Sequence, residues 1–416
     1  MKRELIAASP IPAAPSVADR AVERALQLLW ASTAIGRLGD SITMVALVWV
    51  VFEVTGSAAG QASFQFAYTS VIAVGSLLVG AVLDRYRVVP AMVADGLGRA
   101  VIGGVVIFAL ALNVAVLPAA LLVAVYLGLT LHFAGNGFPA IVAAALAPAA
   151  HPRANMIEAL AGATAGITGP VVAGALIASS GVSAALIAGA VASLVGALVL
   201  WAGRRPLADR LPPRSVGIVG RAGIAAGIRY VWQRPVLLST ALAFAGGSVF
   251  GVMATVALPL YATQVLRADV GGYAALVSAA SLGAIPGIIV GRAVAARIGV
   301  GWAMVGGMLI AGLLQAALGL IHDLPAAVAL TAGAGFVGGS TGAWANTLRM
   351  ANMDAAMRGR AFGAMRAITH APAPFAALAA AWVVPAVGIP GTFILAGGGA
   401  IAMGIGLALV RGIREG

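Results

Sequence analysis

Residues 26–54 read LQLLWASTAIGRLGDSITMVALVWVVFEV, and Arg37, Asp40 and Glu53 are the only charged residues in the stretch. A helix that crosses a bilayer needs roughly 20 mostly apolar residues. The segment therefore predicts a membrane-spanning helix. Charged side chains are costly inside such a helix, so Arg37 and Asp40 require a structural or a functional reason.

The composition extends this prediction to the whole chain. Of the 416 residues 61% are hydrophobic and 9% are charged, and the mean hydropathy is +1.03. Soluble domains cannot bury so much apolar surface, which indicates an all-α polytopic membrane protein. The chain has no cysteine, which excludes disulfides and thiolate metal sites, and we expect no metal and no cofactor other than a coupling ion.

The apolar segments predict 12 transmembrane helices. Their expected ranges are 26–53, 62–83, 89–112, 116–138, 156–178, 183–203, 236–262, 271–291, 302–321, 326–348, 361–386 and 391–410.

The basic residues indicate the topology. With the N-terminus inside, 22 of the 25 Lys and Arg residues fall in segments that face the cytoplasm, whereas Arg267 alone falls in an outer loop. This bias predicts that both termini are cytoplasmic. The start, MKRELIAASPIPAAPSVADR, lacks the apolar core of a signal peptide and is expected to be a cytoplasmic tail. The net charge of +12 is thus a topology signal rather than a nucleic-acid surface.

The chain divides into two similar halves. Gly80 and Gly287, Arg153 and Arg358, and Pro170 and Pro374 recur about 205 residues apart. The expected parts are a tail (1–25), a six-helix half (26–203), a linker (204–234) and a second six-helix half (235–416). Duplicated six-helix halves are typical of transporters whose substrate site lies between them near the bilayer midplane.

Several motifs resemble those of the major facilitator superfamily, and within it the bacterial efflux group of macrolide, Tap-like multidrug and enterobactin exporters. They are LGD (38–40), TGSA (55–58), GAVLDRYR (80–87), ADGLGRA (94–100), GPVVAG (169–174), GIRYVWQRP (227–235) and RGRAFG (358–363). The resemblance implies a monomeric transporter of the bacterial cell membrane. It would export a small amphipathic organic molecule against protons by rocking its two pseudo-symmetric halves.

The resemblance also implies a cytoplasmic latch around GAVLDRYR. Its candidate residues are Asp84, Arg85, Arg87, Asp95, Arg99, Arg358 and Arg360. Asp84 would pair across the halves near the start of the eleventh span, and Tyr86 and Gly291 depart from the family pattern, so the latch is expected on one side only. Asp95 and Arg99 share a helical face and can pair. Because they are expected within about 9 Å of the cytoplasmic end of the span, they are assigned to the latch rather than to the substrate site. A loop charge that only sets topology is the alternative.

The fifth span carries GITGPVVAG, which resembles the motif associated with exporters. Gly166, Gly169, Pro170 and Gly174 would flatten and bend the helix so that it packs against the opposite half. Such bends also occur in membrane helices generally. The fourth span has Leu131 or His132 where the family's arginine is usual, so a proton relay through that arginine is not carried over.

Arg37 and Asp40 define the candidate coupling site. Asp40 lies about 14 residues, roughly 21 Å, into the first span, past the middle of a 30 Å hydrocarbon layer. An acid that alternates between an isolated and a paired environment can carry a proton. The alternative is a permanent structural pair of Asp40 with Arg37. A further alternative for Arg37 is that its side chain only extends towards the inner surface.

Large, soft and polar side chains on other spans are candidates for a substrate cavity, although helix packing is a competing role for each. They are Met44, His132, Asn136, Phe250, Met253, Trp344, Asn346 and His370.

Other functions stay open at this point. A siderophore or metabolite exporter, an importer or facilitator, and a receptor or sensor could share the fold. A membrane enzyme is disfavoured because the chain has no HExxH, P-loop or GxSxG motif.

Overall fold

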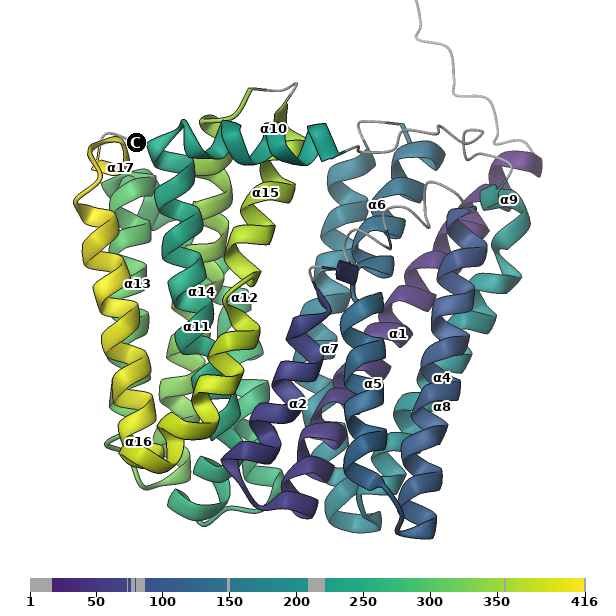
Figure 1. Cartoon of the computed structure of the whole chain (residues 1–416). Coiled ribbons are helices and arrows are strands. Elements are labelled where there is room, and N and C mark those ends of the chain that lie inside the picture. The colour runs from purple at the N-terminus through teal and green to yellow at the C-terminus, as the bar shows by residue number, and fades with distance from the viewer. Residues whose placement is uncertain are drawn as a thin grey trace, which may run out of the picture.

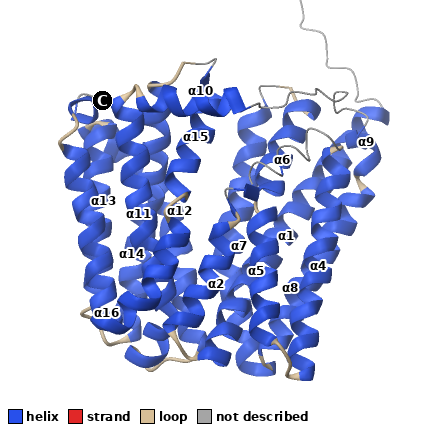
Figure 2. Cartoon of the chain, viewed as in Figure 1, coloured by secondary structure: helices blue, strands red, loops and turns tan. Residues whose placement is uncertain are grey.

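The computed structural model describes residues 17–72, 74, 75, 79, 87–147, 150–208, 221–354 and 357–414. Within these ranges every regular element is a helix, as the composition predicted (Figure 2). The N-terminal half contains α1 (Val17–Thr55), α2 (Ala58–Ser70), α4 (Val88–Leu112), α5 (Val116–Thr130), α6 (His132–Ala145), α7 (His151–Ser180) and α8 (Val182–Ala202).

The segment between the halves carries α9 (Arg204–Ala208) and α10 (Arg221–Trp232). The C-terminal half contains α11 (Pro235–Leu260), the π-helical turn η2 (Tyr261–Val265), α12 (Val270–Ile298), α13 (Val300–Leu318), α14 (Leu324–Ala351), α15 (Arg358–His370), α16 (Ala373–Ala408) and α17 (Arg411–Arg414).

Nine helical stretches of the described chain are long and apolar enough to cross a membrane. The last of them, Arg358–Ala408, has 51 residues, more than twice the length that one crossing needs. It bends at Gly388, whose φ of 75° leaves the helical region, and it therefore provides two crossings. The fourth expected span corresponds to α5 and α6 together. The range 62–83 is described only in part, so the count of twelve stays a prediction.

Short polar side chains begin several helices at the ends of the bundle. Asp269 accepts a hydrogen bond from the backbone of Gly272 at the start of α12 (3.2 Å), and Asp323 accepts one from Ala326 at the start of α14 (3.0 Å). These carboxylates satisfy amide groups that the first turn of a helix leaves unpaired. Their charge is explained by capping and requires no further role.

The helices form two bundles, one from each half of the chain (Figure 1). The start of α1, α9, α10 and α17 lie at the same end of the bundles, which we call the linker face. The opposite end is called the far face. The described parts nearest the two termini are thus on one side, as the charge pattern predicted.

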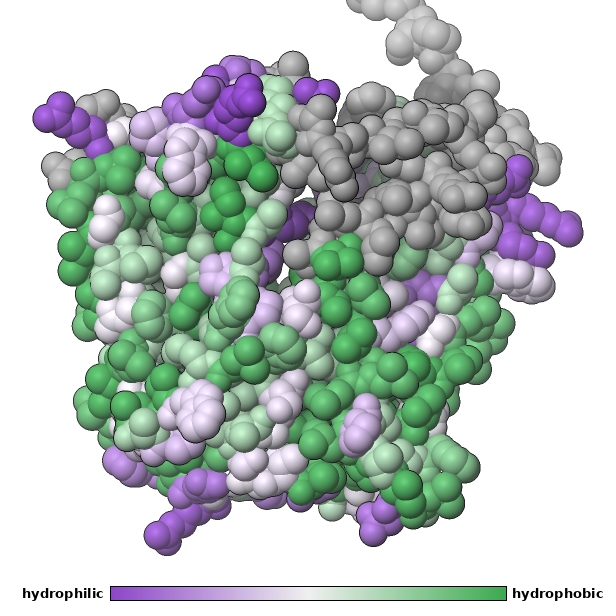
Figure 3. All heavy atoms as spheres, viewed as in Figure 1, coloured by the Kyte–Doolittle hydropathy of each residue, from purple (hydrophilic) through white to green (hydrophobic). Residues whose placement is uncertain are grey.

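The two bundles share a hydrophobic core only away from the linker face. This shared core joins Trp49 of α1 to Tyr273 of α12 and Val384 of α16, and the rings of Trp49 and Tyr273 are 6.0 Å apart. Separate cores lie at the linker face: one holds Leu207 of α9, and two others hold Ile413 of α17 and Val231 of α10. The surface is hollowed between the halves, and hydrophilic atoms are visible in the hollow (Figure 3). The halves are therefore joined at the far face and part towards the linker face.

Glycines bring α12 and α14 together in the C-terminal half. A Cβ added at Gly287 would collide with the backbone of Phe336, and one at Gly335 would collide with that of Ala280. Ser340 Oγ donates to the carbonyl of Gly287 (2.6 Å) across this contact. Small residues allow such close packing in lipid, where the hydrophobic effect does not drive helices together.

Candidate functional site

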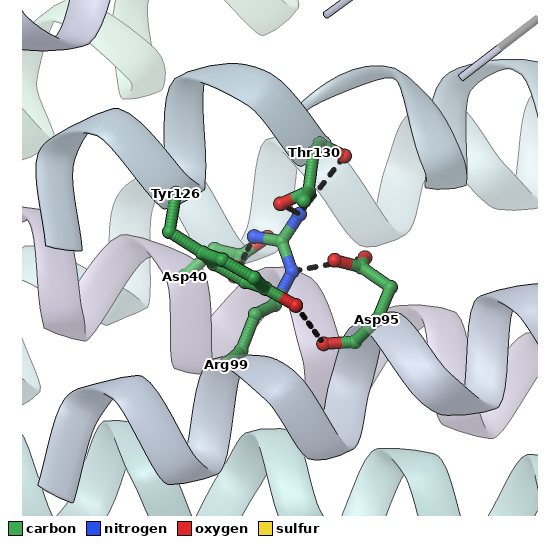
Figure 4. A network of polar contacts seen from close by, with 5 residues as sticks. All are labelled: Asp40, Asp95, Arg99, Tyr126 and Thr130. Carbon is green, nitrogen blue, oxygen red and sulfur yellow. Dashed lines mark hydrogen bonds and ion pairs between the residues drawn. The ribbon is translucent and has the colours of Figure 1, made fainter. Parts of the chain in front are cut away.

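Arg99 of α4 lies at the centre of a polar network inside the N-terminal half (Figure 4). Its Nη1 donates to Asp40 Oδ1 of α1 (2.7 Å), and its Nε donates to Asp95 Oδ2 (3.0 Å). Its Nη2 donates to the carbonyl (3.1 Å) and the hydroxyl (2.9 Å) of Thr130 at the end of α5. One guanidinium thus connects three helices.

The helical spacing explains why these groups converge. Asp95 and Arg99 are four residues apart on α4, as are Tyr126 and Thr130 on α5, so each pair shares a face. Tyr126 Oη donates to the backbone carbonyl of Asp95 (3.2 Å). The two faces meet with Asp40 of α1 between them (Figure 4).

The network lies near the middle of the membrane-spanning helices. Asp40 is 17 residues from the start and 15 from the end of the apolar stretch Glu23–Thr55, and Arg99 is 11 residues into Val88–Leu112. Arg99 therefore also binds a carboxylate at the centre of α1 and lies deeper than the expected depth of about 9 Å, whereas Asp95, seven residues into Val88–Leu112, lies close to that depth. The assignment of the pair to the latch stays a prediction. Their pairing with each other is confirmed.

Arg37 does not pair with Asp40, which corrects the expected structural pair between these two residues. Its Nη2 instead donates to Glu158 Oε1 of α7, and Asp40 is paired with Arg99. The described residues of the N-terminal half therefore form two separate ionic contacts in its interior. One joins α1 to α4 and the other joins α1 to α7.

The two carboxylates that share Arg99 differ in their access to solvent. The side chain of Asp40 is 42% exposed, whereas that of Asp95 is 8% exposed. With both acids ionised the group of three carries one excess negative charge, and one proton makes it neutral. Protonation of one carboxylate leaves Arg99 paired with the other, so the cation is never left alone in a low-dielectric interior.

A cavity of about 240 Å³ lies beside the network, between α1, α4, α6 and α8. Its polar lining includes Ser32, Thr33, Arg37, Asp40 and Asp95. Oδ1 of Asp95 and Nε of Arg37 are buried without a hydrogen-bond partner among the described residues. Polar atoms around a space of this size can hold ordered water, so the carboxylates can be hydrated from inside the bundle.

The expected exporter bend on α7 faces two neighbours. A Cβ at Gly166 would come within 2.7 Å of Ser281 Oγ, and one at Gly174 within 2.7 Å of Ala274, both on α12 of the opposite half. Gly169 faces Ser41 of α1. Three residues before Pro170, the carbonyl of Ile167 accepts a hydrogen bond from Ser278 of α12 (2.9 Å). The motif therefore packs across the halves, and its role in the direction of transport stays a prediction.

The residues expected in a substrate cavity are scattered. Trp344 is buried and donates to the carbonyl of Gly291 (2.9 Å) within the C-terminal half. Its role is therefore helix packing, which corrects the expectation that it lines a substrate cavity. Met253 belongs to the shared core and Met44 packs against it, and the space beside Gly399 of α16 is filled by the ring of Phe250.

The polar members of that set take different places. Asn346 is exposed, and the side chain of Asn136 lies outside the described residues. His132 at the start of α6 is buried, and His370 at the end of α15 is half-buried. The two histidines thus lie on opposite halves of the chain.

The latch can be placed only in part. Asp84 and Arg85 lie outside the described residues. Arg87 precedes α4, and Arg358 and Arg360 lie in the first turn of α15; all three are exposed. The latch therefore stays a prediction.

Sequence reasoning missed two members of the network, Thr130 and Tyr126. Polar residues spaced four apart on an otherwise apolar helix are a signal that could have pointed to them. Among the described residues no group of three or more His, Asp or Glu side chains could hold a metal.

Comparisons with known proteins agree with this architecture. A family model for the Major Facilitator Superfamily matches residues 29–291. The multidrug efflux pump Tap of Mycolicibacterium fortuitum is 28% identical over 402 residues, which cover 94% of this chain and 96% of that protein.

Solved structures share the fold at low sequence identity. A POT family transporter in complex with 5-aminolevulinic acid has a TM-score of 0.75 at 13% identity and covers 93% of this chain and 96% of its own. A bacterial homologue of the iron transporter ferroportin in an inward-facing state has a TM-score of 0.71 at 13% identity and covers 95% and 100%.

Proposed function

The chain belongs to the Major Facilitator Superfamily, and we propose that it works there as a secondary active exporter of small amphipathic organic molecules, driven by proton antiport. Its similarity over nearly its whole length to a multidrug efflux pump supports export. Multi-pass helices and the superfamily make it a membrane transporter rather than an enzyme.

The observation that carries the proton coupling is the sharing of Arg99 by Asp40 and Asp95. A proton carrier must gain and lose a proton without a large electrostatic cost in either state. The network meets this condition because it carries a single excess negative charge. Asp40 is the carrier in this proposal, since it is the more exposed carboxylate and lines the cavity. Asp95 is the residue that holds Arg99 when Asp40 is neutral.

The proposed transport cycle rocks the two halves about their contact. In the state described here α7 and α12 pack against each other from the far face, at Gly174, to the middle of the helices, at Gly166. If the basic linker face is cytoplasmic, this state admits substrate from the cell interior. In the opposite state Asp84 would meet Arg358 and close the linker face.

The test uses protein reconstituted in vesicles with an imposed pH gradient. Ethidium and carboxyfluorescein, one cationic and one anionic dye, are the probes. The wild type should accumulate at least one of them against its gradient. Asp40→Asn should bind and exchange that dye but lose accumulation, because its side chain stays neutral. Glu53→Gln is the matched control, since Glu53 is an exposed acid on the same helix, bonded by Trp49.

Three results would contradict the proposal. Full accumulation by Asp40→Asn would remove Asp40 from proton coupling. Transport that stops when a sodium gradient is collapsed, but continues when the pH gradient is collapsed, would show that sodium rather than the proton is the coupling ion. Binding of the dyes without any flux would favour a receptor or sensor.

A further inference from the structure

The linker helix α10 runs across the ends of the C-terminal helices at the linker face rather than along them (Figure 1). One side of it packs on α11 and α15. Tyr230 and Val231 are buried in a core with Met365 of α15, and a Cβ added at Gly227 would come within 2.5 Å of the carbonyl oxygen of Arg360 in the first turn of α15. The helix is therefore attached to the C-terminal half.

Polar contacts hold the end of α10 in the same orientation. The hydroxyl oxygen of Tyr230 accepts a hydrogen bond from the backbone N–H of Asp354 (2.7 Å). Asp354 also pairs with Arg234 (2.8 Å), whose guanidinium lies 3.8 Å from the centre of the Tyr230 ring. These contacts decide which side of α10 packs on the bundle and which side stays exposed.

The exposed side of α10 is apolar and basic. Ile228 and Trp232 are four residues apart, so they share a helical face, and both are exposed, Trp232 to 68%. Arg229 is exposed next to Ile228. Large apolar side chains beside a basic one are typical of an amphipathic helix that lies in the plane of the membrane surface.

The place of Trp232 in the chain supports this position. It lies three residues before the apolar stretch Pro235–Val265, which is long enough to cross the membrane. Two other exposed tryptophans lie at span ends of the linker face, Trp201 next to the last residue of α8 and Trp302 in the first turn of α13. Tryptophan is enriched at the boundary between membrane and water. We therefore expect the ring of Trp232 among lipid headgroups rather than in the aqueous phase.

The charge around α10 indicates the class of lipid. Arg358 and Arg360, in the first turn of α15, are exposed, and α15 packs against α10. Together with Arg229, Ile228 and Trp232 they form a surface that we call the interfacial patch. Its three arginines complement negatively charged headgroups, because basic residues at a membrane surface attract anionic lipids.

We propose that the interfacial patch binds the headgroups of anionic phospholipids in the leaflet at the linker face. Ile228 and Trp232 would insert between the headgroups, and the arginines would donate hydrogen bonds to their phosphate oxygens. This inference goes beyond the proposed function, because lipid binding does not depend on what the protein transports.

Lipid binding has a consequence for the conformation, and this consequence rests on the proposed function. In the proposed cycle Arg358 meets the N-terminal half when the linker face closes. A headgroup bound to Arg358 must be released in that step, so anionic lipid should stabilise the state described here. The proportion of anionic lipid in the membrane would thus regulate the exporter.

The test measures which lipids lie next to α10. The chain has no cysteine, so a bimane label at Ile228→Cys has a single site. In phosphatidylcholine vesicles, lipids brominated next to the headgroup serve as quenchers of this label. Brominated phosphatidylglycerol should show an apparent affinity about tenfold higher than brominated phosphatidylcholine.

Arginine variants of the labelled protein test the source of this preference. Arg229→Gln together with Arg360→Gln should remove most of it, whereas Arg229→Lys should retain it because the charge stays. Arg411→Gln is the matched control, since it removes an exposed arginine of the linker face on α17. It should leave the preference unchanged.

A distance measurement tests the conformational consequence. Spin labels at Arg153→Cys and Arg297→Cys lie on exposed ends of α7 and α12 in the two halves. Vesicles that contain phosphatidylglycerol should give a larger fraction of long distances than phosphatidylcholine alone. Arg229→Gln with Arg360→Gln should remove this difference.

The outcomes separate this proposal from the previous one. Equal quenching by the two lipids, or a preference that the double substitution leaves unaltered, would overturn the interfacial patch as a site for anionic lipid. Quenching by aqueous iodide and by neither lipid would place α10 in water and indicate a soluble partner instead. Export under a pH gradient could still stand in these cases.

Two further results concern the consequence for transport. A distance distribution that phosphatidylglycerol does not change would overturn regulation by lipid. A lipid preference that depends on Arg229 and Arg360, in vesicles that accumulate no dye, would support the site and contradict the exporter.

Discussion

The two halves satisfy their buried polar groups in different ways. In the N-terminal half the described interior contacts include ion pairs, between Arg99 and two acids and between Arg37 and Glu158, beside neutral hydrogen bonds such as that from Gln61 to the carbonyl of Val48. Among the described residues of the C-terminal half, the buried donors bond to neutral acceptors: Trp344 donates to the carbonyl of Gly291, and Arg349 donates to the carbonyl of Thr240 (3.2 Å).

The difference indicates that the two halves of the chain have different roles. Buried charges that share partners can change protonation, whereas hydrogen bonds to backbone carbonyls hold a fixed shape. We therefore expect the N-terminal half to respond to protons and the C-terminal half to depend on close packing. The following predictions test this contrast, from the largest expected effect to the smallest.

The largest effect should follow Arg99→Gln. The variant leaves Asp95, with a side chain only 8% exposed, without its cation, and breaking a buried ion pair from one side costs roughly 3–5 kcal/mol. Thermal unfolding in detergent should show a clear loss of stability. Arg99→Gln combined with Asp95→Asn should recover part of it. A melting temperature equal to that of the wild type would remove the ionic character that distinguishes this half.

Gly287→Ala should be the next most damaging change. Its Cβ would collide with the carbonyl of Phe336, so α12 and α14 must separate, at a cost of about 2 kcal/mol. Gly338→Ala on α14 is the control, because a Cβ there meets no atom within 4 Å. The yield of folded protein and its melting temperature should fall for the first variant alone. Equal behaviour of the two would show that close packing does not limit this half.

Ser278→Ala should loosen the contact between the halves without unfolding either. It removes the hydrogen bond to Ile167 of the opposite half, worth about 1 kcal/mol or roughly a fivefold change in population. Spin labels at Val114→Cys and Leu320→Cys, both exposed, should report a larger fraction of long distances. Thr168→Ala, which loses only a bond within α7, should not change the distribution.

The smallest effect is expected for Asp354→Asn. Asp354 pairs with Arg234 at the linker face (2.8 Å), and the two side chains are 65% and 36% exposed. Exposed pairs contribute about 0.5 kcal/mol and are screened by salt. The free energy of unfolding should fall by no more than this amount, and at high salt the variant and the wild type should unfold at the same temperature. A loss as large as that of Arg99→Gln would show that the setting of an ion pair does not decide its contribution here.

Helix positions were predictable because hydropathy reports the solvent of each segment directly. The expected ranges 183–203 and 236–262 differ by a few residues from α8 (Val182–Ala202) and α11 (Pro235–Leu260). The pairing of Asp95 with Arg99 was predictable for a similar reason, since residues four apart on a helix always share a face. The same reasoning failed for Arg37 and Asp40, where closeness along the chain was not the decisive factor.

The sequence by itself determined the class of the protein and most of its membrane segments, and it predicted a duplication and the side of the membrane for the basic loops. These properties depend on the transfer of each segment between water and lipid and are local. Only the tertiary structure decided that Asp40 meets an arginine 59 residues away, that Glu158 takes Arg37, and that α10 packs on α15. Partners of buried charges depend on which helix faces meet, and that choice is made by packing between helices rather than within them.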